Sequence, residues 1–410
     1  MTALPAPEGA SAPSLSIVIP AYNEEAAIAS IIIRTLAARD SIRAVAGVGA
    51  IEVIVVSDGS TDRTADIARG YADISLIAYA RNRGYGAAIQ AGFATARGEL
   101  LGFLDADGTC DPAFFGPLCR QLLAAGDDVV LGARLGEDSA MPPVRRLGNT
   151  LYAGLLRLLG ARGVTDSASG MRVLRRSSLP RLYPLPSGMH FTPAMSSVAL
   201  FDARLRISEV AMPYADRTGD SKLHPLRDGV RFLRAIVDTA LTYRPMRFFG
   251  TAGFLLLLLA VAYGTYPTLF YARHLRLEEW MFYRLSAVAV AVQVGAHLVT
   301  MGVLAQQSVA LIHQDPTTGP PLYQRLVAVL RRNLLRWGML STAGGVLLNW
   351  RALYTYFTTR TVTVHWIYIV TGGMLVTLGL QCLSFAALAR LLDTLAWRQR
   401  ARERAPRTGT

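Results

Sequence analysis

The sequence predicts a mainly parallel α/β domain followed by an α-helical membrane domain. In the first half, short apolar runs alternate with helical patterns, which is typical of βαβ units whose sheet is covered on both faces. In the second half, uncharged stretches exceed the roughly 20 residues that a helix needs to cross a bilayer. The 410 residues are 52% hydrophobic and 17% charged, which excludes a disordered chain and disfavours a purely soluble enzyme.

The predicted strands of the first half are apolar and short, and helical patterns separate them. We expect strands at 16–20, 51–56, 74–79, 99–104 and 127–133. We expect helices at 24–38, 62–69 and 85–97. Ligands of such sheets bind at the carboxyl ends of the strands, so the polar residues that follow these strands are the functional candidates.

The composition changes near residue 247, which separates the two halves. We expect a disordered leader at 1–14, a catalytic domain at 15–225, an amphipathic juxtamembrane helix at 226–247, a membrane domain of about four helices at 248–397 and a basic cytoplasmic tail at 398–410. The leader lacks the basic and apolar regions of a signal peptide. The helix at 226–247 is expected to lie on the membrane surface; the alternative is that it packs on the soluble domain.

Three uncharged stretches and one weaker candidate predict the membrane spans. They are 248–272, 285–312, 362–389 and, interrupted by Arg351, 337–357. Four spans place both termini on one side, and the arginines that flank them predict that this side is the cytoplasm. If 337–357 is re-entrant, only three spans remain. We therefore expect an integral protein of the inner or plasma membrane with a cytoplasmic catalytic domain.

The charge and the cysteine content restrict the kinds of partner that we expect the chain to bind. The formal net charge is +13, and Lys222 is the only lysine among 42 cations, a bias that indicates genomic base composition. We therefore expect no nucleic acid partner, and anionic lipid instead. Three cysteines give no disulfide framework. A homo-oligomer is left open.

The strongest local signal is Asp105-Ala106-Asp107, directly after a predicted strand. Two carboxylates at such a strand end can turn toward one hard cation, Mg²⁺ or Mn²⁺, together with diphosphate oxygens. The alternative is an ordinary turn.

Polar residues also follow the first two strands. Asp58 is suited to accept a hydrogen bond from a base or ribose, and Tyr22 to flank a base. The alternative is helix capping by Asn23 and Ser60. The segment 82–88 places two glycines at a helix start, where backbone can approach a ligand.

These motifs together resemble family 2 glycosyltransferases of the GT-A fold, a Rossmann-like α/β fold. The closer resemblance is to dolichyl-phosphate mannosyltransferase and its bacterial polyprenyl-phosphate glycosyltransferase relatives. The motifs that carry it are IVIPAYNEE (17–25), SDGSTDRT (57–64), NRGYGAAIQAGFATARGE (82–99), DADG (105–108), GAR (132–134), DSASGMR (166–172) and RTGDSK (217–222). The membrane half resembles these relatives only in having predicted membrane spans, not in its motifs.

The resemblance implies a role for individual residues. Those that would bind the nucleotide are Pro20, Tyr22, Glu24, Asp58, Asp105 and Ala106. Asp105 and Asp107 would hold the metal, and Asp107, Arg217 and Lys222 would act in catalysis, the last two by closing over the diphosphate. Those that would grip the acceptor phosphate are Arg134, Arg145 and Asn149.

The chain also departs from the family pattern. Thr109 stands where the mannosyltransferases have Gln, Asn149 where relatives often have Ser, and Met171 where they usually have Phe. The segment at 190–196 lacks a Glu that relatives often carry. These differences leave the third metal ligand and the identity of the sugar open.

The resemblance implies an inverting, metal-dependent transfer of a sugar from a nucleotide diphosphate sugar to a polyprenyl phosphate. Such an acceptor is largely a dianion at neutral pH and needs positioning by cations more than a general base. The alternatives are transfer to a lipid hydroxyl of the diacylglycerol type, a processive polysaccharide synthase, and an inactive membrane scaffold or lipid translocator.

Overall fold

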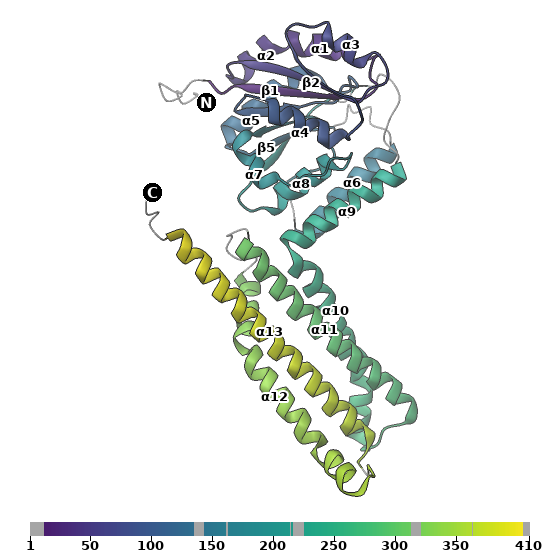
Figure 1. The fold of residues 1–410 in the computed structure, drawn as a ribbon. Helices are drawn as coiled ribbons and strands as arrows, with labels where there is room; N and C mark the ends of the chain where they lie inside the picture. Colours follow the sequence, from purple (N-terminus) through teal and green to yellow (C-terminus); the bar gives the residue numbers. More distant parts are fainter. Residues whose placement is uncertain are drawn as a thin grey trace, which may run out of the picture. The chain divides into compact units, whose positions relative to one another are not determined.

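The structure is a computed structural model that describes residues 12–134, 143–160, 163–213, 215, 225–312, 321–362 and 364–404. The chain forms two compact units, one that ends at Ala240 and one that begins at Leu241 (Figure 1). The division falls inside the predicted juxtamembrane segment 226–247, so most of that segment belongs to the first unit.

Within the described residues, the first unit contains one seven-stranded sheet in the order β3-β2-β1-β4-β6-β5-β7. The strands are β1 (Leu15–Ala21), β2 (Ile51–Asp58), β3 (Ser75–Tyr79), β4 (Leu100–Phe103), β5 (Val129–Ala133), β6 (Arg172–Arg175) and β7 (Ile207–Ala211). Neighbours pair in parallel, except that β6 is antiparallel to both β4 and β5. The five predicted strands and the mainly parallel sheet are therefore confirmed, whereas β6 and β7 are additions that the sequence patterns do not predict.

Helices cover both faces of this sheet. The helices of the first unit are α1 (Ile28–Ala37), α2 (Arg39–Ala46), α3 (Thr64–Arg69), α4 (Tyr85–Thr95), α5 (Phe115–Ala125), α6 (Pro143–Leu158), α7 (Leu179–Leu182), α8 (Phe191–Phe201) and α9 (Pro225–Tyr243), with short 3-10 turns at Pro112–Phe114 and Arg176–Ser178. Ile17 of β1 joins one core together with Ile28 of α1 and Phe115 of α5. Its neighbour Val18 points the other way toward α4, where a Cβ on Gly92 would lie 2.3 Å from Val18 Cγ1.

Helices α6 and α9 pack on each other. The Tyr152 hydroxyl of α6 donates a 2.7 Å hydrogen bond to the carbonyl oxygen of Gly229, and the rings of Tyr152 and Phe232 are 6.0 Å apart. The predicted amphipathic helix at 226–247 is thus α9, although it ends at Tyr243. The chain leaves the helix at Arg244, and Pro245 begins the next one, because proline suits the first helical position.

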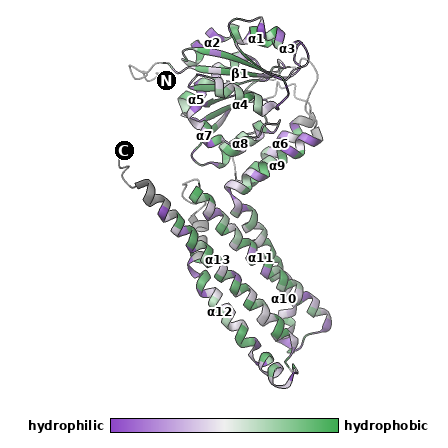
Figure 2. Cartoon of the chain, in the orientation of Figure 1, coloured by the Kyte–Doolittle hydropathy of each residue, from purple (hydrophilic) through white to green (hydrophobic). Residues whose placement is uncertain are grey.

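The second unit is built from four long helices that run side by side (Figure 1), and Figure 2 shows many hydrophobic residues along them. They are α10 (Pro245–His274), α11 (Glu279–Ile312), α12 (Pro321–Thr359) and α13 (Trp366–Arg404). In the described part of the chain, α10, α11 and α13 are long and apolar enough to cross a membrane, and α12 is not among them. Residues 337–357 lie within one continuous helix, which disfavours a re-entrant loop, and the fourth span remains a prediction.

Glycines allow the long helices to approach closely in pairs. A Cβ on Gly253 of α10 would lie 2.6 Å from the carbonyl oxygen of Gly295 of α11. A Cβ on Gly338 of α12 would lie 3.0 Å from the carbonyl oxygen of Gly379 of α13. Such small-residue contacts hold helices together in lipid, where the hydrophobic effect does not.

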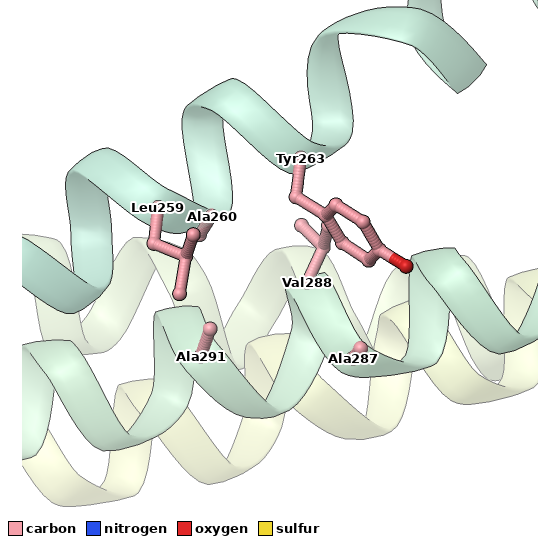
Figure 3. Close-up of a pocket in the computed structure, with 6 residues that line it drawn as sticks. All are labelled: Leu259, Ala260, Tyr263, Ala287, Val288 and Ala291. Carbon is pink, nitrogen blue, oxygen red and sulfur yellow. The ribbon is translucent and has the colours of Figure 1, made fainter.

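A cavity of about 220 Å³ lies between α10 and α11 (Figure 3). Its lining residues are Leu259, Ala260, Tyr263, Ala287, Val288 and Ala291. This lining carries no carboxylate, imidazole or cation. The acidic and basic residues predicted from the sequence belong to the first unit.

Replacement of Gly86 tests the packing of α4. A Cβ at Gly86 would lie 2.2 Å from the carbonyl oxygen of Pro186, so Gly86→Ala is expected to lower the free energy of unfolding by about 1–3 kcal/mol. At Gly154 of α6 a Cβ meets nothing within 4 Å, and Gly154→Ala is expected to raise it by up to about 1 kcal/mol. Urea unfolding of the purified protein measures both, and equal effects would contradict this packing.

Candidate active site

The carboxyl ends of the parallel strands meet at one edge of the sheet. β1, β2, β4 and β5 all end there. β6 runs in the opposite direction and therefore begins at this edge, with Arg172 level with Phe103 of β4 and Leu131 of β5. The predicted acidic and basic residues follow these strand ends, so the fold gathers them at one place.

Hydrogen bonds join the loops that follow β1 and β2. The backbone N–H of Asn23 donates to Ser60 Oγ at 3.1 Å, and Asn23 Oδ1 accepts from the backbone N–H of Thr61 at 2.8 Å. The backbone N–H of Glu24 donates to Thr64 Oγ1 at 2.8 Å. The two loops therefore form one surface.

Helix capping by Asn23 and Ser60 is wrong as an interpretation of these loops. α1 begins after Ala27 and α3 after Arg63, and neither position carries a side-chain cap. Asn23 instead adopts a φ of 52°, a left-handed conformation that asparagine tolerates, and turns its amide toward the neighbouring loop.

The structure places the predicted nucleotide residues of the first loop at different depths. Pro20 is buried within β1, opposite Val56 of β2. Glu24 is half-buried, and the Tyr22 side chain is 37% exposed. Tyr22 is thus the member of this group that presents a ring to solvent.

Asp58 fixes the start of α4. Its side chain is only 2% exposed, and its two oxygens accept from the backbone N–H groups of Arg83 (2.9 Å) and Gly84 (2.8 Å). Gly84 has a φ of 106°, and a Cβ there would lie 2.5 Å from the carbonyl oxygen of Ser187. The close approach predicted for these glycines is therefore made by the chain's own backbone, and Ser187 also accepts from the N–H of Ala87 at 3.0 Å.

The acidic pair lies at the end of β4. Asp107 is 6% exposed, and its Oδ1 accepts from the Thr109 hydroxyl at 2.7 Å and from the Thr109 N–H at 3.1 Å. Ala106 between the two acids is buried, and Asp105 is half-buried. Thr109 thus orients Asp107.

Tyr85 is a neighbour of the acidic pair that sequence reasoning misses. Its hydroxyl donates to Asp105 Oδ1 at 2.6 Å. Burial, together with the negative charge of Asp105, holds the pKa of Tyr85 well above its ordinary value, so the hydroxyl remains a donor at neutral pH. The residue stands in the NRGYGAA motif, but nothing in that motif points to residue 105.

Arg172 is a second residue that sequence reasoning misses, although it ends the DSASGMR motif. Its side chain is fully buried, and it donates to the carbonyl oxygens of Ser167 (2.8 Å) and Ser169 (3.1 Å) and to the hydroxyl of Ser196 (2.9 Å). Burial lowers the pKa of Arg172 to about 10, so it stays protonated at neutral pH. The loop before β6 thus surrounds the Arg172 guanidinium.

Two of the predicted acceptor-phosphate residues meet at one buried carboxylate. Arg134 Nε and Nη2 donate to Asp166 at 2.7 and 2.9 Å, and Asn149 Nδ2 donates to the same carboxylate at 2.9 Å. Burial raises the pKa of Asp166, but the charge and hydrogen bonds of Arg134 outweigh it, and the net shift is downward. Arg134 is therefore held in a bidentate ion pair.

Three predicted residues cannot be placed as side chains. Arg217 and Lys222 lie outside the described residues. Arg145 falls in the first turn of α6, but its side chain also lies outside the described part of the chain. The diphosphate clamp and this part of the acceptor site remain predictions.

The residues at the edge fit a hard cation only in part. Among the described residues, no three His, Cys, Asp or Glu side chains gather into a metal site. Mg²⁺ commonly takes one or two carboxylates from the protein and the rest of its oxygens from substrate phosphates and water, so a pair of carboxylates is compatible with such an ion, and the metal role of Asp105 and Asp107 remains a prediction. Cys110 beside them is buried, which raises its pKa to about 12, so it is a packed thiol.

Two family models match separate parts of the chain. The model described as glycosyl transferase family 2 matches residues 16–182. A second, described as a domain of unknown function, matches residues 245–403. Each match lies within one of the two structural units.

Similar proteins match part of the chain. A low-salt glycan biosynthesis hexosyltransferase of Haloferax volcanii is 33% identical over 59% of this chain, which spans only 57% of that protein. A dolichyl-phosphate hexose transferase of the same organism is 33% identical over 56% of this chain and 95% of that protein. An undecaprenyl-phosphate 4-deoxy-4-formamido-L-arabinose transferase of Edwardsiella ictaluri is 28% identical over 75% of this chain and 91% of that protein.

A solved structure is also similar to part of the chain. The glucosyl-3-phosphoglycerate synthase of Mycobacterium tuberculosis, solved with Mn²⁺, uridine diphosphate and glucosyl-3-phosphoglycerate, is 26% identical over 56% of this chain and 80% of that chain, with a TM-score of 0.42.

The Arg134–Asp166 pair predicts a pH effect on stability. Because the pKa of Asp166 is lowered in the folded state, its contribution is present above the ordinary Asp value of about 3.9 and is lost as the pH falls below it. Asp166→Asn is expected to cost about 3–5 kcal/mol at pH 7 and to flatten the decline in stability as the pH falls below about 3.9.

Unfolding curves at several pH values measure this effect. The matched control is Asp40→Asn, because the Asp40 side chain is exposed and pairs only within its own helix with Arg43. A decline for Asp166→Asn as steep as that of the wild type would contradict the assignment.

Proposed function

The chain belongs to glycosyl transferase family 2, and we propose that it transfers a sugar from a nucleotide diphosphate sugar to a polyprenyl phosphate. The observation that carries the proposal is the pair Asp105 and Asp107 at the end of β4, beside the loops that follow β1 and β2. The names of two relatives, a dolichyl-phosphate hexose transferase and an undecaprenyl-phosphate transferase, support this class of acceptor.

The donor nucleotide binds to the surface formed by the loops after β1, β2 and β4. The residues assigned to it are Pro20, Tyr22, Glu24, Asp58, Asp105 and Ala106. The exposed Tyr22 ring flanks the base. A carboxylate offers about four acceptor sites, so Asp58 can hold the start of α4 and a ribose hydroxyl together.

A divalent cation, Mg²⁺ or Mn²⁺, would be held by Asp105 and Asp107. When bound, it neutralises the charge that develops on the departing diphosphate. From the chain itself, Arg217 and Lys222 close over the same diphosphate. Lys222 supplies a compact ammonium charge there in a protein whose other cations are all arginines.

The acceptor phosphate is bound by Arg134, Arg145 and Asn149. One of its oxygens forms a bond to the anomeric carbon while the bond from that carbon to the diphosphate oxygen breaks, and attack from the opposite face inverts the centre. Since the phosphate is largely a dianion at neutral pH, no proton has to be removed. A lipid hydroxyl would need a base, and the buried carboxylate of Asp166 is already committed to Arg134 and Asn149.

An apolar stripe on α6 supports delivery of the acceptor from a membrane. Leu147, Leu151 and Leu158 are 61%, 63% and 79% exposed and share one face of the helix. Asn149, on the opposite face, reaches Asp166. The same helix thus presents leucines suited to the bilayer interface and a side chain directed to the acceptor site. The arginines that flank the predicted spans support a cytoplasmic position for this unit in the inner or plasma membrane.

Loss of one metal-binding carboxylate tests the proposed chemistry. Asp107→Asn is expected to reduce kcat by at least about 100-fold, because charge on the leaving group would lose its compensation. The control is Asp111→Asn, four residues further along, where the amide retains the capping oxygen that accepts from Ala113. The rates are measured with purified protein, a panel of labelled nucleotide sugars and undecaprenyl phosphate. The labelled product is recovered by lipid extraction. Near-normal turnover by Asp107→Asn would refute the role of this carboxylate.

The acceptor class has its own test. With the nucleotide sugar that supports transfer, undecaprenyl phosphate is expected to be glycosylated at least about 100-fold faster than undecaprenol or diacylglycerol, because only the phosphate is already ionised at neutral pH. The measurement is the labelled lipid recovered from detergent micelles that contain one acceptor each. Equal rates with undecaprenol would favour the hydroxyl-transfer alternative.

A further inference from the structure

Tyr85 joins two parts of the first unit that are distant in sequence. It is the first residue of α4, and the backbone on both sides of it is fixed. Asp58 accepts from the N–H groups of Arg83 and Gly84 just before it. Ser187 accepts from the N–H of Ala87 just after it. The backbone from which the Tyr85 side chain extends is therefore held in place at this edge of the sheet.

The Tyr85 hydroxyl donates a hydrogen bond to Asp105, one of the two acids of the DADG motif. Its 2.6 Å distance to Asp105 Oδ1 is in the range of hydrogen bonds between a hydroxyl and a carboxylate, which are stronger than neutral ones. Asp107 is held in a similar way, since its Oδ1 accepts from the Thr109 hydroxyl. Each carboxylate thus has one oxygen bound to a hydroxyl, but Asp105 receives it from a different element of the fold.

Gly170 restricts the same carboxylate from another direction. A Cβ on Gly170 would lie 2.0 Å from Asp105 Oδ2 and 2.5 Å from its Cγ, so the carboxylate rests against bare backbone. The fully buried Arg172, two residues further, donates its described hydrogen bonds to neutral oxygens, so its positive charge acts on the acids around it. Asp105 is therefore confined by contact on a second side.

We propose that Tyr85 is a positioning residue, which with Gly170 fixes the Asp105 carboxylate for the divalent cation and the donor diphosphate. The inference rests on the proposed function. Its physical basis is preorganisation: a carboxylate that is already oriented loses less conformational entropy when it binds a cation. Tyr85 touches neither the donor nor the acceptor in this assignment, so its removal should weaken cation binding rather than abolish the chemical step.

The test is a Mn²⁺ titration followed by electron paramagnetic resonance, with purified full-length protein in detergent and either uridine or guanosine diphosphate. Tyr85→Phe is expected to raise the dissociation constant for Mn²⁺ about 10- to 100-fold, the effect of losing a hydrogen bond to a charged group. Transfer assays should show the same increase in the Mn²⁺ concentration for half-maximal rate, and a kcat at saturating Mn²⁺ within a few-fold of wild type.

The matched control is Tyr79→Phe. Tyr79 lies on β3, and its ring stacks under the Arg83 guanidinium at 3.9 Å, a contact that phenylalanine retains. Gly170→Ala provides a second variant, which displaces Asp105 from its other side and should also raise the Mn²⁺ dissociation constant. Gly154→Ala is its control, because a Cβ there meets no neighbour.

The outcomes separate the two proposals. If the wild type binds Mn²⁺ and Tyr85→Phe binds it equally well, the positioning role is overturned while the proposed function stands. If the wild type binds no Mn²⁺ with either nucleotide, the metal site and the role of Tyr85 are both overturned. If thermal unfolding shows that Tyr85→Phe is as stable as Tyr79→Phe and only its Mn²⁺ affinity falls, the positioning role is supported over a structural one.

Discussion

The site depends on one buried cation. A guanidinium that is removed from water is costly unless its donors and its charge are both satisfied. Arg172 meets this condition by collecting the carbonyl oxygens of Ser167 and Ser169 and the hydroxyl of Ser196. The loop before β6 is thereby fixed, and this loop carries both Asp166, which pairs with Arg134, and Gly170, on which Asp105 rests. The donor and acceptor parts of the proposed site are thus arranged around the same residue, at the start of the strand that runs against the others.

Much of this arrangement follows from the sequence, because strand ends can be read from apolar runs. The runs that predict β1, β2, β4 and β5 form strands that are almost entirely buried, and parallel strands bring their carboxyl ends together. The positions of Asp58, Asp105 and Arg134 at one edge follow directly. The direction of β6 does not, because the four residues Arg172–Arg175 begin and end with a cation and show no apolar run. The contacts of Tyr85 and Arg172 also cannot be deduced, since they join segments that only the tertiary fold brings together.

Local sequence patterns also fail to predict a contact where one residue type is suited to two roles. Glycine at a helix start indicates a close approach by some other group, but the pattern is the same for a ligand and for the protein's own chain. At Gly84 and Gly86 the group is the backbone at 186–187. Asn23 is similar: it suits a helix cap, yet it joins two loops. In the membrane half, composition identifies α10, α11 and α13 as spans, but the arginines of α12 leave the fourth span to be decided by experiment.

The Arg134–Asp166 pair constrains how a phosphate dianion can be bound. A bidentate ion pair has little net charge, so Arg134 offers a rigid set of N–H donors more than an uncompensated cation. In the proposed reaction, another cation would balance the charge of the acceptor, and the sequence supplies Arg145 in the first turn of α6; Arg217 and Lys222, which precede α9, are assigned to the donor diphosphate. Both segments lead into helices that pack on each other. Since α6 also exposes leucines on its outer face, the cation proposed to balance the phosphate lies on an element that suits the lipid interface. Under the proposed function, a lipid phosphate would meet hydrogen-bond donors at the sheet edge and a neutralising charge on α6, and an acceptor that is already ionised would need no general base.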